Sequence, residues 1–185
     1  LKLENTDVAD QGMEEIGQMA ELMRLNLSKL YVSDTGLAAL QNLTKMTHLD
    51  LDDTRITDAG LLHLAGMKNM RSLMLFQTLV GEEAAAGEEG AAPAVEGLSV
   101  LKNMPDLELL NLRGTSVNDV TLANVAGLSK LTALDLNETI VGDEGMVHLK
   151  GLTALQELGL WNTLVTDAGL EHLSGLTSLR DLDLK

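Results

Sequence analysis

The sequence contains no cysteine, and this absence excludes disulfide bonds, Cys-ligated zinc sites and thiol catalysis. Basic residues are also scarce, because 13 Lys and Arg stand against 28 Asp and Glu, a formal net charge of −15. Nucleic acids and anionic membrane surfaces require clustered positive charge, so this balance argues against both and favours a basic partner. No uninterrupted apolar stretch approaches the roughly 20 residues that a membrane span needs.

The abundant feature of the chain is a repeat of 24 residues. Its clearest copies read LDLDDTRITDAGLLHLAGMKNMRS, LDLNETIVGDEGMVHLKGLTALQE and LGLWNTLVTDAGLEHLSGLTSLRD. A Leu-x-Leu pair opens each unit, at Leu1, Leu25, Leu49, Leu73, Leu110, Leu134, Leu158 and Leu182. The spacing is 24 throughout, except for 37 between the fourth and fifth pairs. A fixed period of this length predicts a solenoid.

Each unit predicts a short strand followed by a small helix. The Leu-x-Leu pair places both leucines on one face of a strand. An acidic residue stands before each expected helix, where it can accept free N–H groups of the first turn, at Asp10, Asp34, Asp58, Asp119, Asp143 and Asp167. A glycine at the far end predicts closure by a left-handed residue, at Gly66, Gly127, Gly151 and Gly175. Stacked in parallel, these units form a curved α/β solenoid with strands inside and helices outside.

The motif LxxLxLxxTx(I/V)xDxGLxxL resembles the leucine-rich repeat family over essentially the whole chain. Its Thr-Asp-x-Gly-Leu signature is similar to the cysteine-containing subclass that occurs beside F-box domains and in many bacterial proteins. The resemblance implies a right-handed solenoid, with a parallel sheet on the concave side and short helices on the convex side. It also implies substrate recognition of the ubiquitin-ligase kind, although no F-box helices are present in the sequence. Threonine fills the slot that Asn or Cys holds in most of the family, and we expect these hydroxyls to hydrogen-bond the backbone at the turn.

We predict a single leucine-rich-repeat domain over residues 1–185, with about seven repeats and a terminal strand. Because the chain begins and ends inside repeats, we expect it to be a fragment of a longer array, or uncapped relative to one. The fourth repeat is too long by residues 82–94, EEAAAGEEGAAPA, which offer no large apolar side chain to a core. Insertions in repeat proteins often border a binding face, but this composition also fits a tolerated loop.

The concave face is where the repeats differ from one another. Positions that point outward from the strands include both the only Phe and the only Trp of the chain, Phe76 and Trp161. Three strand spacings, about 14 Å, separate the two positions, and Arg113 and Asn137 lie between them. Met74 points outward from the position between Leu73 and Leu75. Exposed aromatic residues commonly anchor interfaces, so these five residues are candidate binding residues.

Asp50, Asp52 and Asp53 form an acidic patch at the N-terminal end of the same face. Oxygen ligands at this density suit calcium, but a solvated face or a landing site for Lys and Arg explains them as well. The sequence has no linear calcium-binding loop. We therefore predict neither a metal site nor a cofactor, and we include the three aspartates among the candidate binding residues.

No group of residues suggests catalysis, since neither a nucleophile with its base nor a glycine-rich phosphate loop is present. The sequence therefore predicts a non-enzymatic module that binds a protein or peptide, basic in character, through its concave sheet. The alternative is a structural module that assembles through its open terminal strands, with itself or with further repeats.

Overall fold

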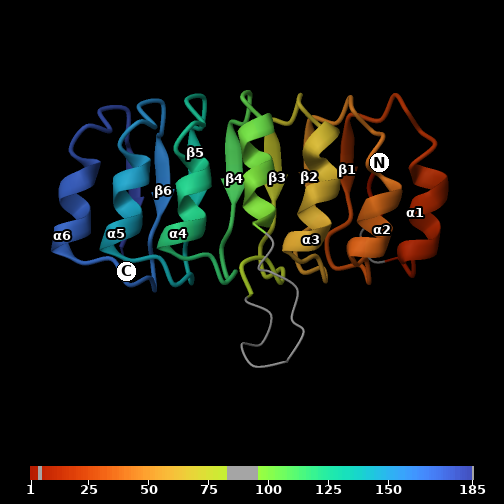
Figure 1. Ribbon diagram of the computed structural model, residues 1–185, viewed down its shortest axis with the longest axis horizontal. Helices are drawn as coiled ribbons and strands as arrows, with labels where there is room; N and C mark the ends of the chain where they lie inside the picture. Colours follow the sequence, from red (N-terminus) through yellow and green to blue (C-terminus); the bar gives the residue numbers. More distant parts are fainter. Residues whose placement is uncertain (4–5, 83–95, 185) are drawn as a thin grey trace.

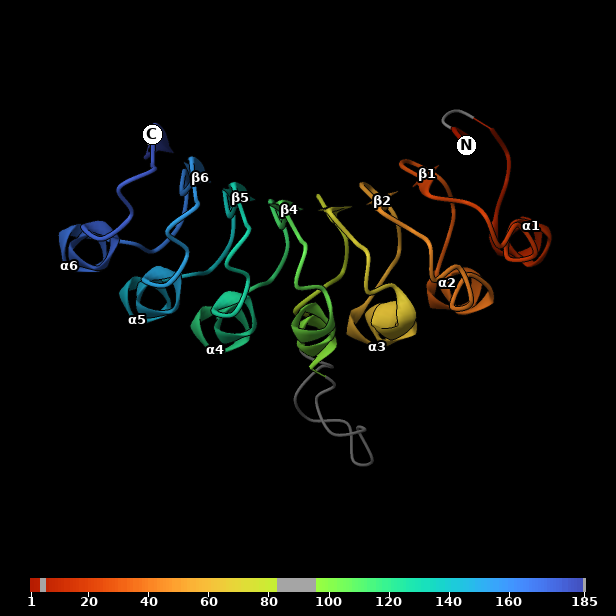
Figure 2. The same ribbon diagram turned by 90° about the horizontal axis from the view of Figure 1, so that it is seen from above.

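The computed structural model describes residues 1–3, 6–82 and 96–184 of the chain. Within these ranges the chain is a curved stack, with a parallel sheet on the concave side and short helices on the convex side (Figures 1 and 2). The described sheet has seven strands in sequence order: β1 (Arg24–Asn26), β2 (His48–Asp50), β3 (Ser72–Met74), β4 (Leu109–Asn111), β5 (Ala133–Asp135), β6 (Glu157–Gly159) and β7 (Asp181–Asp183). The α/β solenoid expected from the repeat period is confirmed.

The register of the sheet follows the sequence period. Leu49 pairs with Leu73, and Leu73 pairs with Leu110 in the same register although 37 residues separate them. The additional residues of the fourth repeat therefore leave the sheet pairing unchanged. At the N-terminal end, the strand expected at the first Leu-x-Leu pair is reduced to a single bridge between Lys2 and Asn26.

The described helices are short and lie together on the convex side. They are α1 (Asp10–Ile16), α2 (Asp34–Ala39), α3 (Asp58–Leu61), α4 (Asp119–Leu122), α5 (Asp143–Met146) and α6 (Asp167–Leu170). Four of them continue directly into 3-10 segments, η1 (Leu62–Gly66), η3 (Ala123–Val125), η4 (Val147–Leu149) and η5 (Glu171–Leu173), whereas the fourth repeat has the 3-10 helix η2 (Gly97–Asn103) instead. In the part of the chain that is described, none of these helices has the length and apolar character to cross a membrane.

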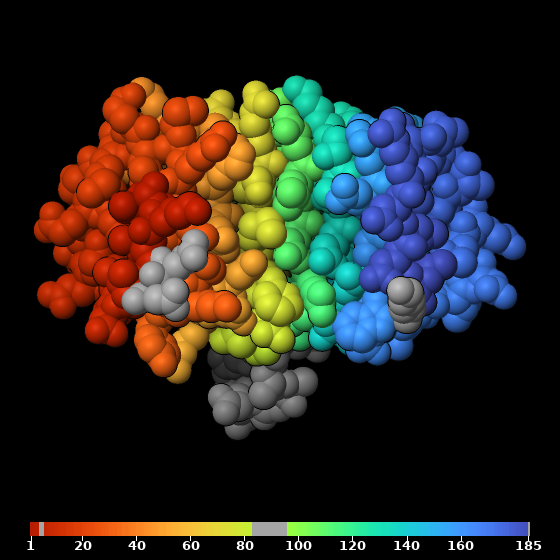
Figure 3. All heavy atoms as spheres, turned by 180° about the vertical axis from the view of Figure 1, so that it is seen from behind, coloured from red at the N-terminus to blue at the C-terminus, as the bar shows by residue number. Residues whose placement is uncertain are grey.

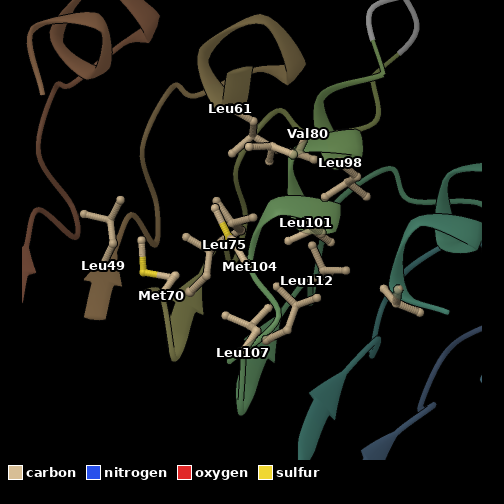
Figure 4. Close-up of a cluster of buried hydrophobic side chains, with 14 of the residues drawn as sticks. Leu49, Leu61, Met70, Leu75, Val80, Leu98, Leu101, Met104, Leu107 and Leu112 are labelled. Carbon is tan, nitrogen blue, oxygen red and sulfur yellow. The ribbon is translucent and has the colours of Figure 1, made fainter. Parts of the chain in front are cut away.

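The core lies between the sheet and the helices, and Leu, Met, Val and Ile make up nearly all of it. Figure 4 shows the part that joins the third, fourth and fifth repeats, where Leu75, Leu98 and Met104 come together from the strand and helix layers. Burial of a side chain of this size stabilises the fold by about 1.5–3 kcal/mol. Since each repeat packs on the next, the core is one continuous apolar layer along the stack.

The aspartates at the helix starts link neighbouring repeats, whereas we expected them to cap their own helices. The N-cap of α3 is Thr57, whose hydroxyl accepts the Ala59 N–H. The carboxylate of Asp34, one repeat earlier, accepts the Thr57 backbone N–H at 2.9 Å and its hydroxyl at 2.6 Å. The same pair of bonds joins Asp10 to Ser33 and Asp143 to Thr166. Each aspartate is the first residue of its helix, so its side chain can reach the N-cap of the next repeat.

The glycine of the Asp-x-Gly motif makes room for that carboxylate. A Cβ atom on Gly60 would lie 2.1 Å from Oδ1 of Asp34, and one on Gly169 would lie 2.5 Å from Oδ1 of Asp143. Real Cβ atoms do not approach oxygen so closely, so a side chain here displaces the aspartate. The motif is therefore a contact between repeats and not a local turn signal.

The glycines that follow the helices do not adopt the left-handed conformation that we expected. Among the described glycines, only Gly81 and Gly114 have positive φ. The four expected positions, Gly66, Gly127, Gly151 and Gly175, are not among them. The helices instead run on through right-handed 3-10 segments and loops, which need no left-handed residue.

The buried threonines satisfy the backbone within their own repeats. The Thr54 hydroxyl donates to the Leu51 carbonyl at 2.5 Å, and the Thr115 hydroxyl donates to the Leu112 carbonyl at 2.6 Å. The expected hydrogen bond to the backbone at the turn is confirmed. These bonds run to carbonyl groups of the same repeat, and Thr163 in addition accepts the Val165 N–H at 3.5 Å.

Asp58 holds the two ends of the insertion together. Its carboxylate accepts the Gly81 N–H at 2.6 Å and the Gly97 N–H at 2.9 Å. In a regular repeat, Asp143 accepts from Thr166 and Gly169 in the same way. Of the predicted insertion 82–94, only Glu82 lies within the described residues, but its flanks thus keep the geometry of an ordinary repeat.

Candidate binding surface on the concave sheet

Phe76, Arg113 and Trp161 form one cluster on the concave side, which Figure 3 views face on. The guanidinium carbon of Arg113 lies 5.5 Å from the centroid of the Phe76 ring and 5.4 Å from that of Trp161. Both distances are within the range of a cation–π contact, which is worth about 0.5–1 kcal/mol at exposed sites. The sequence placed these residues in one column, and the structure shows that the arginine bridges the two rings.

Glu138 completes this cluster. One of its carboxylate oxygens, Oε1, accepts hydrogen bonds from Nε of Arg113 at 2.8 Å and from a terminal nitrogen of the same guanidinium. Glu138 has a φ of 59°, in the left-handed region, at the turn that follows β5. The ion pair fixes the arginine between the rings, so its charge is already neutralised within the protein.

Most polar residues at the last position of a strand, between the two leucines of the Leu-x-Leu pair, accept a backbone N–H two residues later. Asn111 accepts from Arg113 at 2.9 Å, and Asp135 accepts from Asn137 at 3.0 Å. Asn26 and Asp50 make the equivalent bonds to Ser28 and Asp52. The position between the two leucines varies from repeat to repeat. Wherever it makes this bond, it is restricted to a short side chain with an oxygen acceptor.

Both aromatic residues stand where this local acceptor is absent. The strand ends two positions before Phe76 with Met74, and two positions before Trp161 with Gly159. Neither residue offers a side-chain acceptor for a conventional hydrogen bond. The preceding repeat supplies the acceptor instead. Asp52 accepts the Phe76 N–H at 2.8 Å, and Asn137 accepts the Trp161 N–H at 2.6 Å.

Asn137 is consequently committed to the backbone. Asn137 is 8% exposed, and its side-chain oxygen accepts the Trp161 N–H. From the sequence, Asn137 was predicted as a polar binding residue between the two aromatic anchors, and that role stays a prediction. The structure adds that Asn137 holds the Trp161 backbone in place.

Two aspartates of the acidic patch, Asp50 and Asp52, likewise accept hydrogen bonds from the backbone of the sheet. Asp50 accepts from both the Asn26 side chain and the Asp52 N–H. Burial, followed by the neighbouring charges of Asp50 and Asp53, raises the pKa of Asp52 to about 6, although its bond from the Phe76 N–H acts in the opposite direction. Asp53 lies in the left-handed region with a φ of 55°.

This left-handed conformation recurs directly after the strands. It occurs at Lys29, Asp53, Gln77, Gly114, Glu138 and Asn162, with φ between 51° and 66°. From the sequence, we interpreted the residues at this repeat position as a freely varying surface. The backbone therefore sets a common direction for these side chains, and only Gly114 adopts it without a steric cost.

A shallow hollow of about 320 Å³ lies beside the cluster, over β3 to β7. Its lining includes Met74, Asn111, Asp135, Gly159 and Asp183. The sequence identified Met74 as a candidate and did not distinguish Gly159. The only signal for the hollow was a glycine in a column that otherwise contains side chains.

The other candidate groups do not come together. Among the described residues, no three His, Asp or Glu side chains form a group that suits a metal ion. His63, His148 and His172 all lie in the convex 3-10 segments, far from the concave cluster in the fold. A separate cation–π pair, Arg55 over Tyr31 at 5.8 Å, was not anticipated from the sequence.

Comparison with known proteins supports the repeat assignment. A family model described as Leucine Rich repeat matches residues 42–65 and 127–150. A search of curated proteins finds no match. The cysteine-containing, F-box-associated subclass gains no support, because the chain has no cysteine.

Three solved structures share the fold. An internalin (inlF) from Listeria monocytogenes is 22% identical, with a TM-score of 0.75, and the alignment covers 100% of this chain and 54% of the internalin. An internalin C2 from the same species is 26% identical with a TM-score of 0.68, over 98% of this chain and 78% of the other. The plant peptide hormone receptor RGFR1, in complex with RGF2, is 19% identical with a TM-score of 0.58, over 92% of this chain and 29% of the receptor.

The chain thus spans about half the length of the first internalin. The matches to the repeat model, the parallel sheet with its layer of short helices, and the likeness to internalins together show that the chain has the fold of a leucine-rich-repeat solenoid.

Proposed function

We propose that the chain is a non-enzymatic module that binds an extended segment of another protein or a peptide across its concave sheet. The observation that carries this proposal is the cluster of Phe76, Arg113 and Trp161. Its rings lie on an open, curved surface and are held in place by Arg113 and Glu138.

Preorganisation of this kind favours binding. Trp and Arg are enriched among residues that dominate interface energies, and rigid anchors reduce the entropy lost on association. Trp161 remains 36% exposed even with the arginine against it, so part of its ring is open to a ligand. RGFR1, which shares the fold, is a peptide hormone receptor, and this agrees with a peptide as the class of ligand.

Selection from a display library of random 12-residue peptides, with the chain as bait, tests the proposal. Synthetic versions of the enriched peptides are then titrated, and the emission of Trp161, the only tryptophan, reports binding. We expect Trp161→Ala to weaken binding at least about tenfold, as measured by calorimetry, because loss of a central aromatic anchor costs on the order of 2 kcal/mol. Phe76→Ala should weaken the same peptides.

Tyr31→Ala is the matched control. Tyr31 is also exposed and also contacts an arginine, but it lies outside the concave columns. The Tyr31→Ala variant should bind the selected peptides as the parent chain does. A library that yields no peptide, or peptides that bind the Trp161 and Phe76 variants as tightly as the parent, would contradict the proposal.

A further inference from the structure

The lining of the hollow beside the aromatic cluster includes Gly159, where β6 presents no side chain. Asp135, Gly159 and Asp183 are direct partners in the register of β5, β6 and β7. Gly159 therefore leaves a gap in a row whose neighbours on both sides are aspartates. A Cβ atom on Gly159 would lie 2.7 Å from Nδ2 of Asn137 and 2.8 Å from Oδ1 of Asp135, so the glycine is needed for these two side chains to take their places.

The charge around the hollow is of one sign. Four acidic residues, Asp135, Glu157, Asp181 and Asp183, belong to its lining, and the described lining contains no Lys or Arg. The nearby cation, Arg113, is paired with Glu138 and lies between the two rings.

Asp135 is partly buried, so its own negative charge is not fully solvated, whereas Glu157, Asp181 and Asp183 are exposed. Burial raises the pKa of Asp135, and the charges of Asp183 and Glu138 act in the same direction, whereas the Asn137 N–H and Arg113 lower it. A cation placed in the hollow would relieve both the burial cost and the repulsion.

We propose that the hollow at Gly159 receives the side chain of a lysine or arginine from a peptide that lies along the concave face against Trp161. The volume is at the lower end of the range for ligand pockets, which suits one long side chain. Trp161 follows Gly159 by two residues and so faces the same side of the sheet. The inference rests on the proposed function and specifies the ligand of the same surface.

The test compares the selected peptides with versions in which each Lys or Arg is replaced by Met, which keeps a long stem without the charge. Both versions are titrated against the parent chain and against the double variant Asp135→Asn/Asp183→Asn. Asn at position 135 retains the hydrogen bond to the backbone, since Asn26 and Asn111 make that bond in other repeats. Urea unfolding of each variant verifies that it folds.

The matched control is Glu144→Gln/Glu171→Gln, which removes the same charge from exposed positions in the helix layer. It should change the dissociation constant less than about twofold, because exposed distant charges are screened. The double aspartate variant should weaken the basic peptide at least about tenfold, since a desolvated ion pair is lost. It should bind the Met peptide as the parent does.

The outcomes separate the two proposals. Selected peptides that depend on Trp161 but contain no required basic residue, or that bind the double aspartate variant unchanged, overturn this inference alone. A library that yields no peptide overturns both this inference and the proposed function.

Discussion

Backbone hydrogen bonds determine which residue types occupy several positions of the concave face. After each strand a backbone N–H needs an acceptor, and a short polar side chain at the last position of the strand usually supplies it. Where that residue is Met74 or Gly159, the acceptor comes from one repeat earlier. Asp52 and Asn137 therefore occupy equivalent positions, but one is a carboxylate and the other is a neutral amide.

This difference predicts a pH dependence that Asp52→Asn should remove. The pKa of Asp52 is about 6 in the folded chain, against an ordinary value of 3.8, so the folded state binds this proton more tightly than the unfolded state. The resulting stabilisation is complete below about pH 3.8 and is lost as the pH rises through about 6. Asn keeps an acceptor for the Phe76 N–H, as Asn137 does for Trp161, and carries no charge.

We therefore expect Asp52→Asn to be more stable than the parent by about 1 kcal/mol at pH 7.5, a value reduced for partial solvent exposure. At pH 4 the two proteins should be nearly equal. Urea unfolding at both pH values measures the difference. An equal difference at the two pH values would show that the charge of Asp52 is not the cause.

At the scale of elements, the solenoid is joined by a contact between an aspartate and a glycine in successive helices. The carboxylate of one helix start accepts the N-cap of the next, and the glycine two residues into that next helix leaves the space for it. Helices of four to seven residues have little stability of their own, so such contacts and the core beneath them hold the layer together.

Gly60→Ala should therefore destabilise the chain far more than a helix glycine normally would. The new Cβ would lie 2.1 Å from Oδ1 of Asp34, which must move and release the Thr57 N–H and hydroxyl. We expect a loss of about 3 kcal/mol, measured by urea unfolding, from the broken bonds and the steric strain.

Gly175→Ala is the control, because a Cβ there meets no atom within 4 Å and its φ is not positive. It should leave stability unchanged or raise it by about 0.5 kcal/mol, since alanine reduces the entropy of the unfolded chain. Equal effects of the two substitutions would exclude the proposed contact.

At the scale of the whole molecule, successive strands of the described sheet pair in the same register, although the fourth repeat is longer than the others. Asp58 accepts from Gly81 and Gly97, as Asp143 does from Thr166 and Gly169. Removal of residues 83–95 would join the flanks into Val-Gly-Glu-Glu-Gly-Leu, which matches Val-Gly-Asp-Glu-Gly-Met at residues 141–146.

We expect this deletion to fold with the same cooperativity and to be more stable by about 1 kcal/mol, because a shorter loop costs less entropy to close. The denaturant midpoint and slope measured by urea unfolding test this. Loss of a single cooperative transition would mean that the removed residues are needed for the repeats to join.

The sequence predicted the repeat fold because a fixed period specifies the same contacts in each unit. Leu49, Leu73 and Leu110 could be placed on one strand face from spacing alone, and Phe76 and Trp161 could be placed in one column. The left-handed closure expected at Gly127 and its equivalents was wrong, because a glycine pattern does not distinguish a positive φ from a right-handed loop.

The sequence by itself determined the solenoid, its repeat boundaries and its acidic, cysteine-free character, since these depend on local pattern and composition. Only the tertiary structure decided that Asp34 binds the next repeat, that Arg113 joins two aromatic rings, and that Gly159 lines a hollow between aspartates. The physical reason is that these three features depend on which side chains of different repeats come within a few ångströms, and the curvature and register of the stack decide those distances.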